Sequence, residues 1–221
     1  FTRESFFSQR IKDKQVISLQ SIYGNYTVTL KAVQSYLTER LEKYGRSIYA
    51  SRGESAYEHL ESRIKSEESM REKCLRKGLE PTALSALTKI HDAVGVRIIC
   101  RFVEDVYDVA AYIGELEGCT VVTAKDYIKD VKPNGYRSYH IIVAVDITAN
   151  EEAHIIGGTY FAEIQLRTIA MDTWASLEHQ MKYKKKIDNA EMISRELKRC
   201  ADELASCDFS MQTIRNLIRR Q

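Results

Sequence analysis

The chain has 221 residues, 44% of them hydrophobic, which suits one core with helical extensions. Its formal net charge is only +2, so composition argues against a strongly basic surface for bulk nucleic-acid binding, and any anion site must come from local clustering. Five Cys without a CxxC spacing argue against a zinc site or a disulfide framework and fit a reducing cytoplasm. No apolar run approaches the roughly 18 residues that span a bilayer, so we expect no membrane partner.

The first third of the chain predicts helices around one strand. Arg10–Tyr23 is expected to form a short helix. Apolar residues three and four apart predict an amphipathic helix from Tyr26 to Gly45 that packs on a sheet. Tyr57–Lys65 is expected to be a strand followed by a loop. A further helix is predicted from Ser66, a suitable N-cap, to Gly78, a suitable C-terminal stop.

Basic and hydroxyl side chains gather at the start of this last helix: Arg63, Lys65, Ser69 and Lys73. Such groups beside a helix N-terminus can form a phosphate site. A solvated charged face is the commoner explanation for this segment taken alone.

The middle of the chain predicts alternating elements. Leu79–Ile90 is expected to be a helix with a break at Glu80-Pro81. Gly95–Val103 is expected to be a strand, Val106–Leu116 a helix and Cys119–Ile128 a strand. Asp92 stands just before the strand at Gly95, where it could be a metal ligand, an N-cap or an ion-pair partner.

The His91-Asp92 pair could suggest a metal-dependent HD phosphohydrolase. The further His and Asp ligands that such a site requires are not evident, so we reject that function.

The nine residues KPNGYRSYH, from Lys132 to His140, have the composition of a nucleotide-binding loop. Cations and amides can bind phosphates, an aromatic face can stack on a base, and a Gly lets the backbone pass close. The loop precedes two predicted strands, Tyr139–Ile147 and Thr159–Leu166, which the hairpin-like connection Thr148–Gly158 joins.

Three polar residues of the last strand, Glu163, Gln165 and Arg167, alternate with apolar ones. A period of two places them on one face, with the apolar residues in the core. Three such groups in a row are costly unless paired or used, so we favour a functional role.

Two helices are predicted at the end of the chain. Ala170–Lys186 carries Trp174, the single Trp, which we expect in the core rather than in a site. From Ile193 to Ile218, apolar residues alternate steps of four and three, which is a heptad seam. The seam must pack on the chain's own N-terminal helix or on another subunit, and we favour a homo-oligomer.

Two carboxylates on adjacent strands, Asp92 and Glu163, can hold Mg²⁺, which typically takes one or two carboxylates plus substrate phosphates. The nearby cations would stabilise the developing charge. Physical chemistry alone therefore favours phosphoryl or nucleotidyl transfer and does not name the substrates.

Four motifs occur in order: RIKSEESMREK (Arg63–Lys73), DAVGVRI (Asp92–Ile98), DYIKDVKPNGYRSYH (Asp126–His140) and EIQLRTIAMDTWASLEHQMKYK (Glu163–Lys184). Together they closely resemble the synthetase domain of the RelA/SpoT family over about residues 55–186. With no hydrolase domain before the motifs and no regulatory domain after them, the sequence resembles a small alarmone synthetase.

The resemblance implies an α+β fold, the nucleotidyltransferase-like core of the polymerase-β type, with a mixed β-sheet flanked by helices. It implies a cytoplasmic GTP pyrophosphokinase that transfers pyrophosphate from ATP to the 3′-hydroxyl of GTP, GDP or GMP. The products would be (p)ppGpp-type alarmones of the bacterial stringent response and AMP. We expect a helical extension over residues 1–54, the synthetase core over 55–186 and an oligomerising helix over 187–221.

The resemblance also assigns roles to residues. Asp92 and Glu163 would bind Mg²⁺, and Glu163 would activate the 3′-hydroxyl as a general base. The ATP-binding residues would be Arg63 and Arg97, which sandwich the adenine, and Lys65, Ser69 and Lys73, which hold the phosphates. Tyr136 would stack on guanine, and the acceptor would be oriented by Lys132, Asn134, His140, Gln165 and Arg167.

One stretch departs from the family pattern. Long members with a basic signature have Arg-x-Lys-Asp where this chain has Thr123-Ala124-Lys125-Asp126. The Arg of that signature is therefore missing here, and the signature assigns this chain no preferred acceptor or metal.

Two other functions stay open. A toxin-type member would pyrophosphorylate the 3′ end of tRNA, but the nearly neutral net charge gives this little support. A silent nucleotide- or RNA-binding regulator would be expected to lack one acid, whereas both are present. For the synthetase itself, a tetramer is the favoured assembly, and RNA binding stays open as a form of regulation.

Overall fold

The computed structural model describes residues 21–183 and 189–220. In chain order the elements are η1 (Gly24–Tyr26), α2 (Thr27–Arg52), β1 (His59–Ile64), α3 (Glu67–Arg76), η2 (Ser85–Lys89), β2 (Val94–Cys100), α4 (Val103–Gly114), β3 (Cys119–Asp126), β4 (Tyr139–Ile147), β5 (Gly158–Thr168), α5 (Ile169–Tyr183) and α6 (Ala190–Ile218). The helix predicted for Arg10–Tyr23 lies almost entirely outside the described residues.

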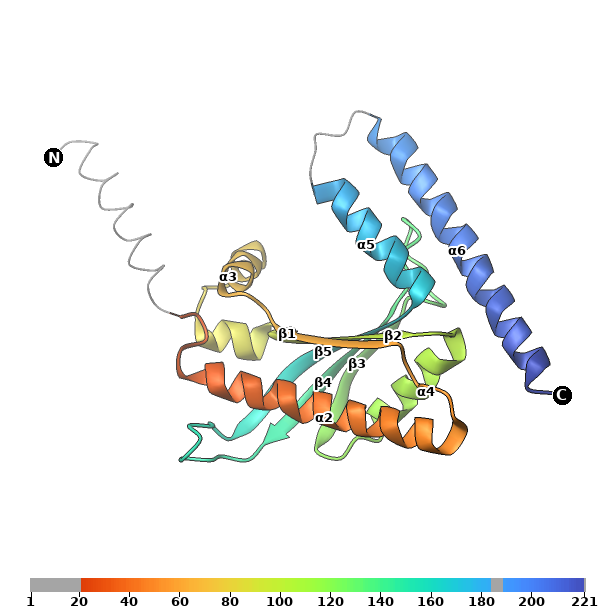
Figure 1. Ribbon diagram of the computed structural model, residues 1–221. Coiled ribbons are helices and arrows are strands. Elements are labelled where there is room, and N and C mark those ends of the chain that lie inside the picture. The colour runs from red at the N-terminus through yellow and green to blue at the C-terminus, as the bar shows by residue number, and fades with distance from the viewer. Residues whose placement is uncertain (1–20, 184–188, 221) are drawn as a thin grey trace, which may run out of the picture.

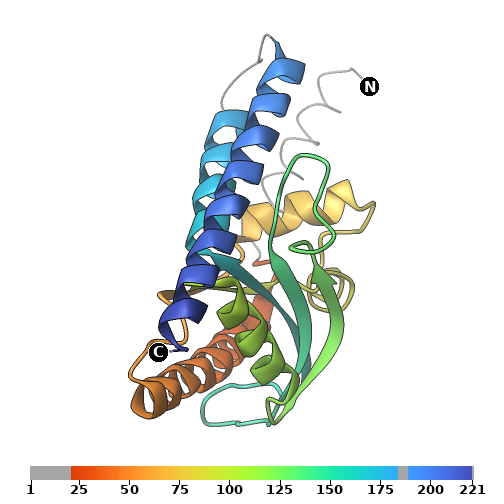
Figure 2. The ribbon, with the colours of Figure 1, turned by 90° about the vertical axis from the view of Figure 1, so that its right-hand side faces the viewer.

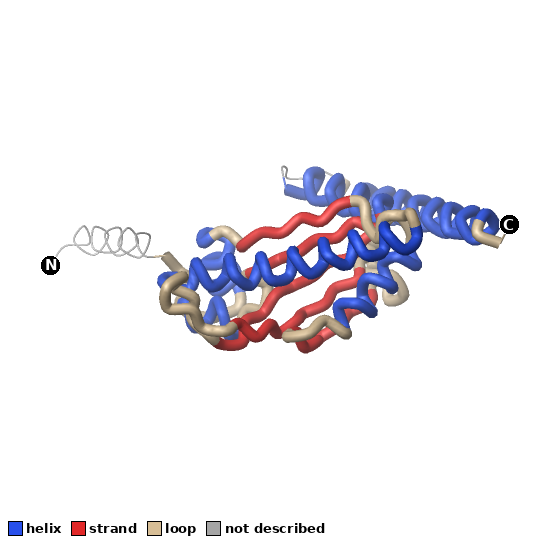
Figure 3. The backbone as a smooth tube through the Cα atoms, turned by 60° about the horizontal axis from the view of Figure 1, so that its bottom comes forward, coloured by secondary structure: helices blue, strands red, loops and turns tan. Residues whose placement is uncertain are grey.

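The five strands form one mixed sheet in the order β1-β2-β5-β4-β3 (Figures 1 and 3). β2 and β5 run parallel, and the other neighbours are antiparallel. A parallel pair needs a long crossover, and α4, β3 and β4 supply it. The predicted mixed sheet flanked by helices is confirmed.

One face of the sheet is apolar and forms the core. Alternate residues of β2, β4 and β5 point into it, as the period of two predicted for β5 requires. α2 and α4 cover this face (Figures 1 and 3). The stripe on α2 that contains Leu30, Val33, Leu37 and Leu41 is fully buried against it. α2 therefore belongs to the main core, as its amphipathic pattern predicted.

The opposite face carries polar side chains. α3 and α5 stand over its two ends and leave the middle uncovered by helices (Figure 1). α5 continues directly from β5, and α6 runs back alongside α5 (Figure 2).

The packing of α6 includes a surface that the prediction did not name, since the seam was expected to meet the N-terminal helix or another subunit. A small second core joins α5 and α6 through Trp174, Ala175, Leu197 and Ala201. The Trp174 Nε1 donates to the carbonyl of Leu197 at 2.7 Å, so Trp174 is a core residue as predicted. The short connection between the two helices makes this antiparallel pairing the nearest apolar surface available.

Two predicted boundaries were wrong. The helix expected to end at Gly45 continues to Arg52 and ends at Gly53, which has φ 69°. Gly45 instead leaves room for the Tyr57 ring, since an added Cβ would lie 2.9 Å from the Tyr57 hydroxyl oxygen. The helix expected over residues 79–90 is shorter than predicted: the break expected at Glu80-Pro81 is present, helical structure begins only at residue 83, and η2 covers Ser85–Lys89.

Candidate active site

On the uncovered face of the sheet, the register of the strands decides which side chains lie next to one another. Arg63 of β1 pairs with Gly95 of β2, and Gly95 pairs with Glu163 of β5. One step along, Arg97 pairs with Gln165, which pairs with His140 of β4. Because paired residues share a face, residues from distant motifs meet on one surface.

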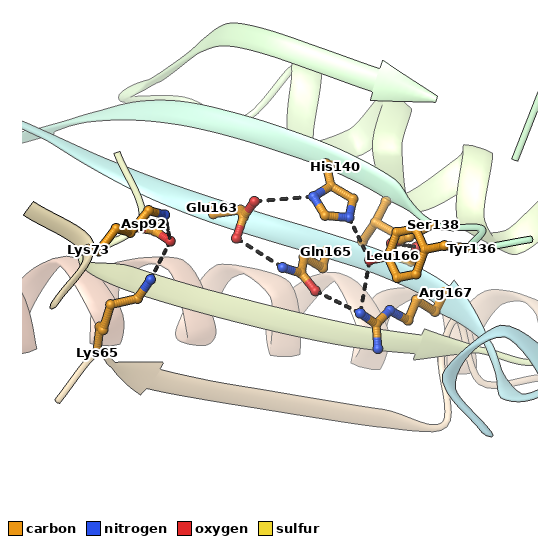
Figure 4. A network of polar contacts seen from close by, with 10 residues as sticks. All are labelled: Lys65, Lys73, Asp92, Tyr136, Ser138, His140, Glu163, Gln165, Leu166 and Arg167. Carbon is orange, nitrogen blue, oxygen red and sulfur yellow. Dashed lines mark hydrogen bonds and ion pairs between the residues drawn. The ribbon is translucent and has the colours of Figure 1, made fainter. Parts of the chain in front are cut away.

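Asp92 lies two residues before β2, at the end of the sheet where α3 begins. Its Oδ2 accepts hydrogen bonds from the ammonium groups of Lys65 and Lys73 (Figure 4). Burial lowers the pKa of Lys65, while the Asp92 carboxylate opposes that shift. The other oxygen, Asp92 Oδ1, is buried and accepts no hydrogen bond from any described residue, so the carboxylate keeps one acceptor unused.

Glu163 belongs to a closed ring of hydrogen bonds (Figure 4). His140 Nδ1 donates to Glu163 Oε1 at 3.1 Å, and Gln165 Nε2 donates to Oε2 at 2.9 Å. Arg167 Nη2 donates to Gln165 Oε1 at 3.1 Å and to the Tyr136 hydroxyl at 3.0 Å. The Tyr136 hydroxyl and His140 Nε2 lie 2.8 Å apart and close the ring.

The ring sets the charge state of Glu163. Burial by itself would raise the pKa of this carboxyl, but hydrogen bonds from His140 and Gln165 outweigh burial and lower the pKa to about 2. With both neighbours donating, Glu163 is fully ionised near neutral pH.

Two cavities open on this face, and Asp92 and Glu163 line both of them. The first, of about 410 Å³, we call the strand cavity. Its other lining residues are Glu61, Ser62, Arg63, Lys65, Gly95, Val96, Arg97 and Gln165.

The second, of about 460 Å³, we call the lysine cavity. Its other lining residues are Lys73, Lys77, Lys89, His91, Thr123, Lys125, Tyr127, Lys132, His140 and Ile142. Five ammonium groups around one cavity make a strong site for a multiply charged anion.

The loop from Lys132 to His140 forms the edge of the lysine cavity. Its turn is closed by a hydrogen bond from the Gly135 amide to the Lys132 carbonyl at 2.8 Å, and Gly135 has φ 90°. The Lys132 ammonium lies 4.2 Å from the ring centroid of Tyr127 and 4.8 Å from that of Tyr136. Aromatic and cationic groups are therefore presented together, as the loop's composition predicted.

The structure brings most of the predicted ATP-binding residues to the strand cavity. Arg63, Lys65 and Arg97 line it, whereas Lys73 reaches Asp92 from the lysine cavity. Ser69 is exposed at the start of α3, where its amide donates to the N-cap Ser66.

The predicted acceptor residues divide into two groups. Lys132 and His140 line the lysine cavity, while Gln165 lines the strand cavity. The Arg167 guanidinium is buried and pairs with Asp172 at 2.8 Å, so it holds neighbouring side chains in place.

The other two acceptor candidates are engaged within the protein. Asn134 contacts Glu178 of α5 at 3.3 Å, and the Tyr136 ring packs against the small core of α5 and α6.

Sequence reasoning missed several cavity residues. Lys77 directly follows α3, whereas Lys89 belongs to η2 and Lys125 to β3, and only the fold gathers them. The T-shaped contact of Tyr127 with His140, at a centroid distance of 5.3 Å, was also missed. The alternation of Thr123 and Lys125 on one face of β3 was the available signal for part of this set.

The donor set fits a hard divalent cation. Asp92 offers a buried oxygen without a partner, and Glu163 offers an ionised carboxylate at the same boundary between cavities. Among the described residues, no three His, Cys, Asp or Glu side chains form a ligand cluster. The remaining ligands would therefore be substrate oxygens and water, which is the pattern of Mg²⁺ sites.

The described helices include none that is long and apolar enough to cross a membrane.

Comparison with known proteins gives a consistent set of matches. Residues 62–188 match the family model described as a region found in RelA / SpoT proteins. GTP pyrophosphokinase YwaC of Bacillus subtilis (strain 168) is 42% identical over 163 residues, covering 74% of this chain and 76% of the relative. GTP pyrophosphokinase YjbM of the same organism is 35% identical over 162 residues, covering 73% of each.

Solved structures match in the same way. Small alarmone synthetase 1 of Bacillus subtilis bound to its product pppGpp superposes with a TM-score of 0.76 at 30% identity, covering 87% of this chain and 96% of that one. Small alarmone synthetase 2 of Bacillus subtilis has a TM-score of 0.74 at 37% identity, covering 85% and 94%.

Proposed function

The chain belongs to the RelA/SpoT family, and on that premise we propose that it is a small alarmone synthetase with GTP pyrophosphokinase activity. It transfers pyrophosphate from ATP to the 3′-hydroxyl of a guanosine nucleotide. One observation carries this proposal: Asp92 and Glu163 line both cavities, so a group can pass from a molecule in one to a molecule in the other beside both carboxylates.

We assign ATP to the strand cavity. Arg63 and Arg97 lie on the neighbouring strands β1 and β2, on the same face, where their planar groups can enclose an adenine. Gly95 lies beside them, and a Cβ there would meet only the Arg63 carbonyl at 3.9 Å, so the floor of the cavity is open. Lys65 stands at the Asp92 end, where the phosphates would lie.

We assign the guanosine nucleotide to the lysine cavity. Its lysines come from four segments and suit a 5′-polyphosphate. Tyr136 lies beside this cavity through its contact with His140, and a base stacked on its ring would place the ribose toward Glu163.

Mg²⁺ held by Asp92 and Glu163 would neutralise phosphate charge and polarise the group being transferred. Lys65 and Lys73, which already converge on Asp92, supply further positive charge at the same place.

The reaction balances without another reactant. The 3′-hydroxyl oxygen bonds to the β-phosphorus of ATP, the bond from that phosphorus to the oxygen bridging to the α-phosphorus breaks, and AMP leaves. The hydroxyl proton goes to a base, and Glu163 is the ionised group at the boundary. Because its pKa is about 2 while His140 and Gln165 donate to it, Glu163 becomes an effective base only after the acceptor displaces one of those hydrogen bonds.

The direct test uses ATP labelled on its terminal phosphates, with Mg²⁺ and GMP, GDP, GTP or deacylated tRNA in separate reactions. We expect label on a guanosine nucleotide and release of AMP, and neither with Glu163→Ala. Label on tRNA alone would replace this proposal with the toxin-type function, and no transfer to any acceptor would contradict both.

The assembly state is a separate proposal. The seam of α6 leaves Met211, Ile214 and Ile218 at least half exposed, and such a stripe supports pairing with another copy of the chain. We expect light scattering at micromolar concentration to give a homo-oligomer, with a tetramer favoured, and a monomeric mass would contradict this.

A further inference from the structure

The loop that presents Tyr136 is attached to α6, a helix that lines neither cavity. Arg137 is the one cation of the KPNGYRSYH segment that points away from the lysine cavity. Its Nη1 donates to the carbonyl of Ala201 at 3.1 Å, and its Nη2 donates to Asp202 Oδ1 at 3.0 Å.

A second contact lies next to the first. Gly135 is buried, and a Cβ placed on it would lie 2.6 Å from the Cβ of Ala201 and 3.3 Å from the Cα of Lys198. The loop backbone therefore rests directly on the surface of α6, where only a Gly fits.

A third contact joins the aromatic ring to the same support. Tyr136 packs on the core of α5 and α6, with its ring centroid 6.4 Å from that of Trp174. Trp174 in turn donates to the Leu197 carbonyl of α6. Three successive loop residues, Gly135, Tyr136 and Arg137, are thus supported by residues 197–202 of α6 and by its partner α5.

We propose that α6 positions the acceptor loop, and that Asp202 is a positioning residue for the guanosine nucleotide because it holds Arg137 and thereby fixes Tyr136. This rests on the proposed function only in naming the nucleotide. Asp202 touches neither cavity, so its effect on the acceptor would pass entirely through the loop.

The contact is suited to adjustment. The Asp202 side chain is 46% exposed and is shared with Lys198 at 2.8 Å, whereas the Arg137 side chain is only 16% exposed. Anything that moves or covers this part of α6 would change how firmly the loop is held, without touching the ATP-binding strands.

The test compares Asp202→Ala and Arg137→Ala with Glu203→Ala as the matched control. Glu203 is the next residue of α6 and pairs with Arg199 on the solvent side of the helix. The readouts are KM for GDP, KM for ATP and kcat, together with GDP binding followed by the emission of Trp174, the chain's only Trp. The mass of each variant is checked by light scattering, because α6 also carries the exposed seam.

We expect KM for GDP to rise about threefold in Asp202→Ala, as for a partly exposed pair. A rise of about tenfold is expected in Arg137→Ala, which also loses the bond to Ala201. KM for ATP, kcat and Glu203→Ala should stay within twofold of the unchanged chain, and Asp202→Glu should recover most of the loss. Unchanged KM for GDP in both variants, or an equal rise in KM for ATP, would overturn the proposal.

A second pair of variants tests the backbone contact. Gly135→Ala should weaken GDP binding, and Ala201→Gly in the same chain should restore part of it by removing the Cβ that clashes. The positive φ of Gly135 keeps the restoration partial. No restoration, with Ala201→Gly alone behaving normally, would mean that the contact with α6 is not what holds the loop.

The Trp174 titration separates the two proposals. If the unchanged chain binds GDP but transfers no pyrophosphate, the proposed reaction fails while the positioning by Asp202 is still measured. If it transfers pyrophosphate and Asp202→Ala leaves GDP binding unchanged, only the positioning fails.

Discussion

The two cavities beside Asp92 and Glu163 differ in how their walls are made. The strand cavity is lined almost entirely by residues of β1, β2 and β5, whose spacing is fixed by hydrogen bonds of the sheet. Besides the two shared carboxylates, the lysine cavity takes its lining from α3, η2, β3, β4 and the connecting segments at Lys77, His91, Tyr127 and Lys132. A site built on paired strands is set by register, whereas one built from many separate segments depends on how helices and loops pack.

Their charges differ as well. In the strand cavity Lys65 pairs with Asp92, and Arg97 lies 3.7 Å from Asp172 and 3.9 Å from Glu61. In the lysine cavity, Lys77, Lys89 and Lys125 form no ion pair with another described residue. In the strand cavity the cations are largely neutralised by carboxylates, which suits a flat, uncharged base. In the lysine cavity three cations are not neutralised, which suits a negatively charged group such as a phosphate.

The largest expected effect comes from the residue that the cavities share. Glu163→Gln keeps the shape of the side chain and removes its charge, so the rate of AMP release should fall by about 10²–10³-fold. The measurement is kcat with ATP and GDP, and the melting temperature checks that the variant folds. Activity within tenfold of the unchanged chain would mean that the shared carboxylate does not define the reaction.

The same residue should make stability depend on pH. The folded pKa of Glu163, about 2, lies below the ordinary 4.5, so its stabilising contribution is present above about pH 5 and is lost as pH falls toward 2. Between pH 6 and pH 3 the unchanged chain should lose about 2 kcal/mol more unfolding free energy than Glu163→Gln. Urea unfolding at both pH values measures this, and equal losses would show that His140 and Gln165 do not hold the ionised form.

A larger side chain in the strand cavity should affect ATP without affecting the nucleotide in the lysine cavity. Gly95→Val adds a side chain where only open space lies beyond the Arg63 carbonyl, so the fold should tolerate it. We expect KM for ATP to rise about tenfold, because the added Val side chain would occupy space that the nucleotide needs, and KM for GDP to stay within twofold. Gly114→Val at the end of α4, where a Cβ meets nothing within 4 Å, is the matched control. A larger effect on GDP than on ATP would reverse the assignment of the cavities.

The smallest effects should come from single lysines of the lysine cavity. Lys89→Gln and Lys125→Gln should each raise KM for GTP about threefold, with less effect on GMP and a weaker effect at high salt. Lys129→Gln is the control, because Lys129 lies outside the cavity and its side chain is 76% exposed. Equal effects on GTP and GMP would place the 5′-phosphates elsewhere.

Much of the strand cavity was predictable from the sequence. The alternation in β5 placed Glu163, Gln165 and Arg167 on one face, and the alternation in β2 placed Arg97 on the face opposite the core. Strand faces follow from a period of two, which is local and needs no partner. The sequence did not predict that Arg167 is buried beside Asp172, because that contact depends on where α5 begins.

The lysine cavity was predictable only in part. The composition of the loop predicted a nucleotide site, and the basic cluster at the start of α3 predicted a phosphate site. Neither pattern included Lys77, at the far end of that helix, or Lys89, in a segment that was predicted as a longer helix. Their approach to Lys125 depends on the packing of α3 and η2 at the end of the sheet, which is a long-range outcome.

The sequence by itself determined the family, the mixed sheet with its flanking helices, and the two carboxylates, because motifs and periodicities are properties of short segments. Only the tertiary structure decided that Asp92 and Glu163 lie between two cavities and that α6 packs on α5 and the loop. Residues far apart in the chain meet only when every element between them has packed. The apolar seam of α6 could have packed on the N-terminal helix, on another subunit or on α5, and its sequence does not distinguish these surfaces.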